Sequence, residues 1–231
     1  MQYGRILASA LFAGATTGLI AALLQLAFVQ PTLLHSELYE SGELVHFGGE
    51  LVSAHPALPG FDAMRDGMSI LFTVVIYIGY AMVMVALLAI AEQRGRKITP
   101  KKGLLWGMCG FITFQFAPGL GLAPEVPGVA AADIELRQIW WIGTVISTGL
   151  GLWLIAFGAN KGAYIIGAIL LLLPHVIGAP EPEVFIGPVP PELAALFAAR
   201  AFGVGMAAWV LLGLTSAYFW SAEGNRRQDT T

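Results

Sequence analysis

The chain contains 231 residues, of which 57% are hydrophobic and only 12% are charged, and its mean hydropathy is +0.73. Roughly 25% of the residues of an ordinary soluble domain are charged, so this composition excludes a water-soluble protein. The formal net charge of −3 shows no basic excess of the kind that binds nucleic acid, and we expect no nucleic-acid partner.

Apolar segments along the chain predict membrane-spanning helices, because about 20 mostly apolar residues cross a hydrocarbon core about 30 Å thick. The candidate spans are residues 6–29, 68–91, 103–122, 139–157, 163–177 and 193–220. The fifth is short and follows a Gly-rich stretch that is typical of a tight turn between antiparallel helices. Its alternative is a re-entrant segment that does not cross. We predict an all-α integral membrane protein with about six spans in a single membrane domain, residues 1–231.

The basic residues predict the orientation of these spans, because cytoplasmic loops are enriched in Lys and Arg. With six spans, one side holds Arg5, Arg94, Arg96, Lys97, Lys101, Lys102, Lys161, Arg226 and Arg227. The other side holds only Arg65 and Arg137, while Arg200 lies within the last span. Both termini are therefore predicted to be cytoplasmic, in a bacterial inner membrane. Most acidic residues and all four histidines fall on or near the outer side.

Two predicted outer segments resemble each other. Pro118 is followed by Ala123-Pro124-Glu125, and Pro174 by Ala179-Pro180-Glu181, with the same spacing. One interpretation is a duplicated helical hairpin, since internal repeats are common in transporter folds. The other is that proline simply ends helices at a membrane interface.

The outer loop, residues 30–67, is long, acidic and rich in histidine. A helical stretch here would align Glu43, His46 and Glu50 on one face, with His35 and His55 nearby. Imidazole and carboxylate together suit divalent transition metals. One interpretation is an external metal-capture site, and the other is a solvated amphipathic segment.

Several polar residues lie at or near the predicted spans, where unpaired polar groups are costly. His175, with Glu181 after it, is either a deeper ligand on a substrate path or an interfacial residue satisfied by a carbonyl. Arg200 needs a partner on another helix, such as an acidic residue, or reaches the headgroups; Glu192 and Arg137 complete this set of candidate ion-pair residues. Gln25 and Gln115 are expected to form interhelical hydrogen bonds.

No nucleotide-binding loop, nucleophile elbow or zinc-protease motif occurs, so we predict that the chain is not an enzyme. The pattern as a whole resembles the CbtA family of proposed cobalt transporter subunits. The resemblance rests on Gln30-Pro31, Leu104-Leu105-Trp106-Gly107, Ala117-Pro118, Ala123-Pro124-Glu125, Pro127-Gly128, Ala131-Ala132-Asp133, Arg137-Gln138, Trp140-Trp141, Gly143-Thr144, His175 through Pro182, Val189-Pro190, Glu192-Leu193, Phe197 and Arg200. It implies uptake of divalent cobalt, with a small one-span, His-bearing partner subunit.

Two functional hypotheses follow. In the first, the outer histidines and carboxylates capture cobalt, and His175 with Glu181 passes it inward. In the second, the chain is a non-transporting accessory subunit of a larger energy-transducing or photosynthetic complex, which packs against partners and binds lipid, quinone or pigment. Apart from cobalt as substrate, no cofactor is predicted.

Overall fold

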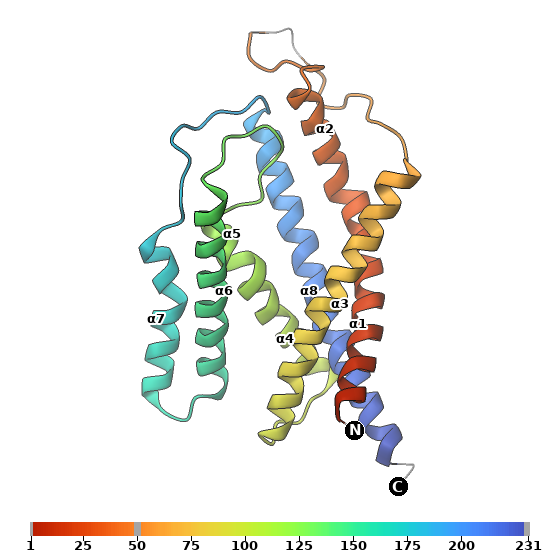
Figure 1. Cartoon of the computed structure of the whole chain (residues 1–231), viewed down its shortest axis with the longest axis vertical. Helices are drawn as coiled ribbons and strands as arrows, with labels where there is room; N and C mark the ends of the chain where they lie inside the picture. The colour runs from red at the N-terminus through yellow and green to blue at the C-terminus, as the bar shows by residue number, and fades with distance from the viewer. Residues whose placement is uncertain (1, 49–51, 229–231) are drawn as a thin grey trace. The chain divides into compact units, whose positions relative to one another are not determined.

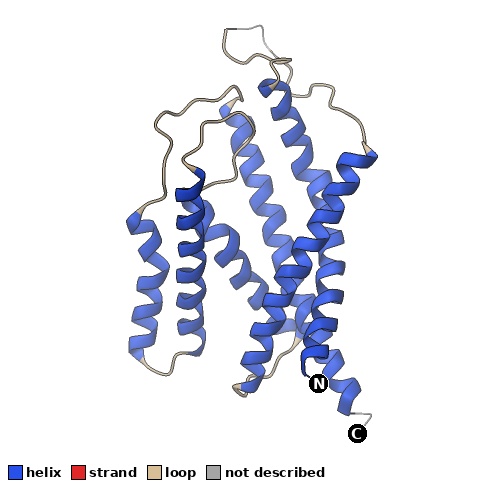
Figure 2. Cartoon of the chain, in the orientation of Figure 1, coloured by secondary structure: helices blue, strands red, loops and turns tan. Residues whose placement is uncertain are grey.

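The computed structural model describes residues 2–48 and 52–228, and this part of the chain consists of helices and loops without a strand (Figure 2). The elements in chain order are α1 (Gln2–Leu24), η1 (Gln25–Val29), α2 (Gln30–Glu40), α3 (Ala63–Gln93), α4 (Pro100–Phe111), η2 (Ile112–Phe116), α5 (Ala117–Gly121), α6 (Ile134–Phe157), α7 (Lys161–Ile177) and α8 (Pro191–Gln228) (Figure 1). The prediction of an all-α protein is confirmed.

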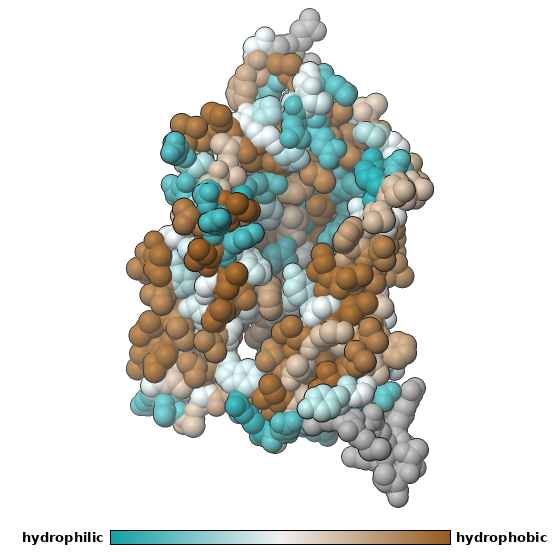
Figure 3. All heavy atoms as spheres, in the orientation of Figure 1, coloured by the Kyte–Doolittle hydropathy of each residue, from teal (hydrophilic) through white to brown (hydrophobic). Residues whose placement is uncertain are grey.

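Five continuous helices are long and apolar enough to cross a membrane. They are Tyr3–Glu40, Ala63–Gln93, Pro100–Gly121, Ile134–Phe157 and Pro191–Glu223, and the shorter apolar helix Lys161–Ile177 accompanies them. On the face shown in Figure 3, hydrophobic residues cover the middle of α3 and of α7. The exposed apolar side chains of α3 include Leu71, Phe72 and Val75, which is the surface that a lipid environment requires.

The first spanning helix extends well beyond the predicted span. It continues through residues 30–40, which we expected in the outer loop, and α3 begins at Ala63, so the connecting loop is residues 41–62. Hydropathy marks the apolar part of a helix, whereas helical hydrogen bonding continues through the polar residues of α2. The predicted loop 30–67 is therefore shorter at both ends.

Two π-helical turns interrupt these helices, and each stands just before a proline. The turn η1 ends two residues before Pro31, and η2 ends two residues before Pro118. A proline inside a helix lacks the N–H and clashes with the carbonyl four residues earlier. A local π turn is one way in which a helix accommodates such a defect, and π turns are frequent at functional sites.

The chain divides into two compact units, and α8 contributes to both. Unit 1 comprises residues 1–27, 60–111 and 203–231, and unit 2 comprises residues 28–59 and 112–202. In unit 1, α1 lies along α3 (Figure 1). Gly14 of α1 lies against the backbone of Ile78 of α3. In the same unit Gly213 of α8 lies against the backbone of Gly103 and Gly107 of α4. Small residues allow this close approach of helices.

One end of unit 1 brings together the start of α1 and the end of α8. The guanidinium of Arg5 donates two hydrogen bonds to the Trp220 carbonyl, at 3.1 and 2.7 Å, and one to Glu92 at 3.1 Å. Its Cζ lies 3.6 Å from the centre of the Trp220 ring. The beginning of the first span and the end of the last one therefore lie at the same end of unit 1, as an even number of crossings requires.

In unit 2, α6 and α7 form an antiparallel hairpin. The Ser147 hydroxyl donates to the Leu170 carbonyl at 2.6 Å, and the Trp140 indole N–H donates to the Pro174 carbonyl at 3.3 Å. At 1.5 Å per residue α7 is about 25 Å long, close to the thickness of a hydrocarbon core. Since α7 is shorter than the five helices that are long enough to cross, its crossing as the fifth of six spans in chain order stays a prediction, with the re-entrant segment as the alternative.

The two resembling segments end their helices with the same hydrogen bond and lie side by side in unit 2. The Leu122 N–H donates to the Pro118 carbonyl, and the Gly178 N–H donates to the Pro174 carbonyl, so each helix ends three residues after its proline. Further on, the Ala130 N–H donates to the Ile186 carbonyl at 2.9 Å. Ala130 and Ile186 each follow their repeat proline by the same number of residues. Equivalent positions therefore meet, which favours a duplication over a coincidence of helix ends.

Candidate functional site

A cavity of about 610 Å³ lies within unit 2. Its walls are formed by α2, by the loop between α2 and α3, and by the first turns of α8. Three of the four histidines line it, together with Glu192 and Arg200. The cavity therefore joins residues that are separated by more than a hundred positions in the sequence.

His35 occupies the wall formed by α2. The side chain is half-buried, and its ring centre lies 5.6 Å from that of Tyr39, one helical turn later. Within the described part of the chain, the Nε2 atom of His35 is buried and has no hydrogen-bond partner. A buried polar atom without a partner is costly, so this nitrogen is suited to binding a ligand in the cavity.

His46 and His55 lie on the loop, and both side chains are exposed. The His46 ring packs edge-on against Phe47, with 4.5 Å between ring centres, and the His55 backbone N–H donates to the Ser53 hydroxyl at 3.1 Å. The predicted helical alignment of Glu43 and His46 is wrong, because α2 ends at Glu40 and residues 41–48 form turns and bends. Gly42 and Gly48, both with positive φ, favour turns at these positions. Glu50 lies outside the described residues.

Arg200 and Glu192 come from α8. The guanidinium of Arg200 donates to the Phe28 carbonyl, in the π turn η1, at 3.2 Å. The acidic partner that we expected for Arg200 does not appear among the described residues; a backbone carbonyl at the irregular turn takes that role. Glu192 is exposed at the start of the helix.

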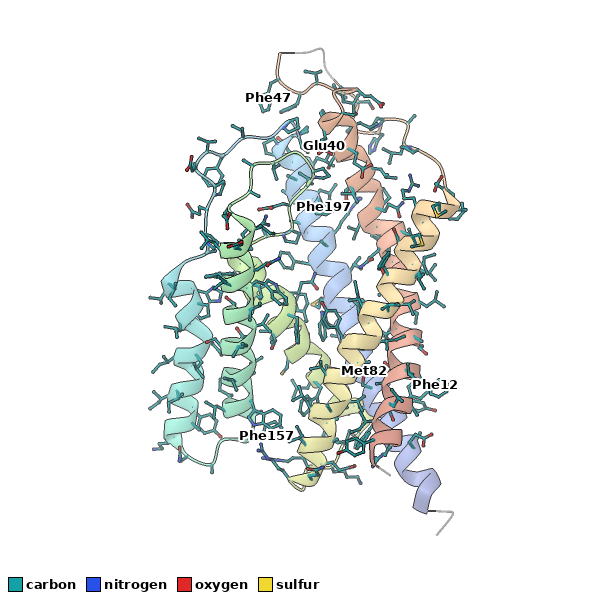
Figure 4. All side chains as sticks on the ribbon, in the orientation of Figure 1. Phe12, Glu40, Phe47, Met82, Phe157 and Phe197 are labelled. Atoms are coloured by element: carbon teal, nitrogen blue, oxygen red, sulfur yellow. The ribbon has the colours of Figure 1, made fainter. Side chains whose placement is uncertain are left out.

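A small apolar cluster holds these elements together. Tyr39, Val126, Val189 and Leu193 are buried against one another, and Phe197, labelled on α8 in Figure 4, packs on them. The cluster joins the end of α2, both repeated loops and the beginning of α8. It fixes the wall of the cavity that carries His35, since Tyr39 belongs to both.

The other predicted site residues lie elsewhere in unit 2. His175 is in the last turn of α7, half-buried, with its ring centre 6.3 Å from that of Trp140. Glu181 and Glu43 are exposed, and neither they nor His175 line the cavity. Arg137 forms an ion pair with Glu125 at 2.8 Å. Within the described ranges, no three His, Cys, Asp or Glu residues come close enough to hold a metal ion by themselves.

The sequence did not predict that Tyr39, Ser53 and Arg200 line the same cavity as the three histidines. The sequence carried one usable signal, the glutamine in each π-turn segment and the proline that follows it. Gln25 and Gln115, which both lie in these turns, do make the predicted interhelical hydrogen bonds. The Thr73 hydroxyl donates to Gln25 at 3.1 Å, and the Gln115 amide donates to the Ala201 carbonyl at 3.1 Å.

Within the described residues, five helices long enough to cross a membrane, one shorter apolar helix and a cavity lined by three histidines define an integral membrane protein with a candidate ligand site. The family described as "Probable cobalt transporter subunit (CbtA)" matches residues 3–221. The chain belongs to this family. Neither the curated proteins nor the solved structures contain a match to it.

Proposed function

We propose that this chain is the membrane-spanning subunit that admits divalent cobalt from the outer side, and that the cavity lined by His35, His46 and His55 is the entry site. The observation that carries the proposal is the buried Nε2 atom of His35, which lacks a hydrogen-bond partner and lines the same cavity as two other histidines. Imidazole nitrogen is a good ligand for divalent transition metals. The family's description as a transporter subunit agrees with this role.

The same description implies at least one partner chain. We propose a small subunit with one membrane span and a histidine-bearing segment, which would hand cobalt to the cavity. The inner membrane of a bacterium is the location that the distribution of Lys and Arg favours. His175 and Glu181 belong to a later stage in this proposal, since the cavity lining does not include them.

The test is equilibrium binding of cobalt to the full-length protein in detergent. Replacing His35, His46 and His55 together by alanine is expected to weaken binding by at least about tenfold, because each lost imidazole removes a metal ligand. The control is Arg137→Gln, which removes a polar side chain of unit 2 outside the cavity and is expected to leave binding nearly unchanged.

Binding that is absent in the wild type, or equal in the wild type and the triple variant, would contradict the proposal. Such a result would favour the hypothesis of an accessory subunit in a larger membrane complex. Purification under native conditions tests this hypothesis, because the chain would then copurify with its partners in a fixed stoichiometry. The second measurement is cobalt uptake by cells that express the chain together with the proposed partner subunit. If these cells accumulate no more cobalt than cells that express the triple variant, a transport role is contradicted.

A further inference from the structure

The cavity has more room than a bare cobalt ion needs. A water molecule occupies about 30 Å³ of liquid, so an ion with six waters fills on the order of 200 Å³. The cavity measures about 610 Å³, which lies in the range of sites for small organic molecules. Its size fits a metal ion that enters with a small organic ligand around it.

The described residues do not complete a coordination sphere. First-row divalent metals take about four to six ligands, whereas no group of three His, Cys, Asp or Glu residues in the described ranges is placed to hold one ion. His35 can supply its unpartnered Nε2, and a loop histidine can supply a second nitrogen. The remaining ligands must then come from water or from a chelator that arrives with the metal.

The charge of the lining also favours a chelator. A site for a free divalent cation is expected to be rich in carboxylates, but the carboxylate in the described lining is Glu192, and it is accompanied by Arg200. The guanidinium repels a free cation. A guanidinium has five N–H donors, and Arg200 uses one of its nitrogens on the Phe28 carbonyl, so its remaining donors suit a carboxylate.

We infer that the substrate is cobalt bound to a small polycarboxylate, taken up as an anionic chelate. In this arrangement His35 binds the metal from one side, while Arg200 binds a carboxylate of the chelator from the other. The inference rests on the proposed entry of cobalt through this cavity and specifies the chemical form in which the metal enters. The Phe28 carbonyl has a positioning role, because it holds the Arg200 side chain at the cavity wall.

The experiment compares free cobalt with cobalt–citrate by equilibrium dialysis against the full-length protein in detergent. Radioactive cobalt and differently labelled citrate are counted together. Excess citrate lowers the free cobalt concentration, so a site for the free ion alone loses its bound cobalt in proportion. We expect bound cobalt to be kept or increased, with citrate retained in a ratio of about one to one, as a coordinated chelate requires.

Arg200→Gln is expected to reduce citrate-supported binding by at least about tenfold, because a charge-assisted contact is lost, while binding of free cobalt persists. Arg200→Lys keeps the charge, so its citrate-supported cobalt binding should lie between that of the wild type and that of Arg200→Gln. The matched control is Arg137→Gln, which removes an arginine of unit 2 whose partner, Glu125, does not line the cavity. Melting curves of all variants show that they remain folded.

The outcomes separate the two proposals. If free cobalt binds through the histidines but citrate removes it in proportion to the free ion, the chelate inference is wrong and the proposed entry site stands. If citrate binds equally well without cobalt, the cavity is an anion site and the inference is also wrong. If neither form binds through the histidines, both proposals fail.

Discussion

The two units of this chain differ in what accompanies their close helix contacts, because a cavity lies within unit 2. In unit 1, glycines let helices touch along their backbones, and Gly213 of α8 lies directly against Gly103 and Gly107 of α4. In unit 2, α2, the loop between α2 and α3 and the first turns of α8 surround a cavity with a buried imidazole nitrogen that has no hydrogen-bond partner among the described residues. Unit 2 also contains a close glycine contact, between Gly151 of α6 and Gly167 of α7, so what sets this unit apart is the cavity with polar residues that can bind a ligand.

The strongest way to break unit 1 is to add a side chain at its closest helix contact. Gly213→Val places a Cβ against backbone atoms of α4, which cannot move aside as a flexible side chain can. We expect a loss of about 2–3 kcal/mol in the free energy of unfolding, the usual range for an overpacked interior. Thermal unfolding in detergent measures this.

Gly79→Val is the matched control within the same unit. A Cβ at Gly79 meets no atom within 4 Å, so the substitution on α3 should leave the melting temperature within a few degrees, as expected for a change of well under about 1 kcal/mol. Equal effects of the two substitutions would show that the crossing of α4 and α8 is not a close contact.

Cobalt binding is expected to respond to pH. A metal competes with protons for imidazole nitrogen, so acidification removes the metal from histidine ligands. Lowering the pH from about 7.5 to about 5.5 should lower the affinity for cobalt by at least about tenfold, because protons compete for the imidazole nitrogens. The sign is fixed: binding is present above this range and is lost as the pH falls.

Dialysis at several pH values provides the measurement, with the triple histidine variant as control. Its residual binding should vary far less over the same range. An affinity that rises on acidification would contradict coordination by the cavity histidines.

Much of this contrast was accessible from the sequence, but unevenly. The spans were predictable because long apolar segments usually cross a membrane. The repeated proline segments indicated two equivalent loops. The continuation of the first helix through Pro31 could not be predicted, because hydropathy does not indicate a π turn. Nor could the partner of Arg200, since the Phe28 carbonyl is available only where the helix is irregular. Cavities between a loop and distant helices depend on packing that spacing alone cannot supply.

A smaller effect is expected at the end of unit 1 where α1 meets α8. Arg5→Gln removes two hydrogen bonds to the Trp220 carbonyl and a cation–π contact with its ring. Because the Arg5 side chain is 16% exposed, the cost should be about 1–2 kcal/mol. Thermal unfolding measures it, and cobalt binding in unit 2 should not change.

Glu92→Gln is the companion variant, since it removes only the ion-pair partner of Arg5. The Glu92 side chain is 42% exposed, so this pair should contribute less than about 1 kcal/mol. If Glu92→Gln costs more than Arg5→Gln, the ion pair and not the carbonyl contact holds the two helices together.

The smallest effect tests whether the repeated loops of unit 2 are also equivalent in energy. Glu125 and Glu181 occupy the same position after their prolines, but Glu125 pairs with Arg137, whose counterpart in the second copy is Leu193. Leu193 instead belongs to the apolar cluster beside the cavity, so the second copy exchanged an ion pair for packing. Glu125→Gln should cost at most about 0.5–1 kcal/mol, as partly exposed ion pairs do, and Glu181→Gln even less. If Glu181→Gln lowers the stability and Glu125→Gln does not, the second loop depends on a contact of Glu181 other than the packing of Leu193. The two repeated segments would then differ more in their side-chain contacts than their matching backbone hydrogen bonds suggest.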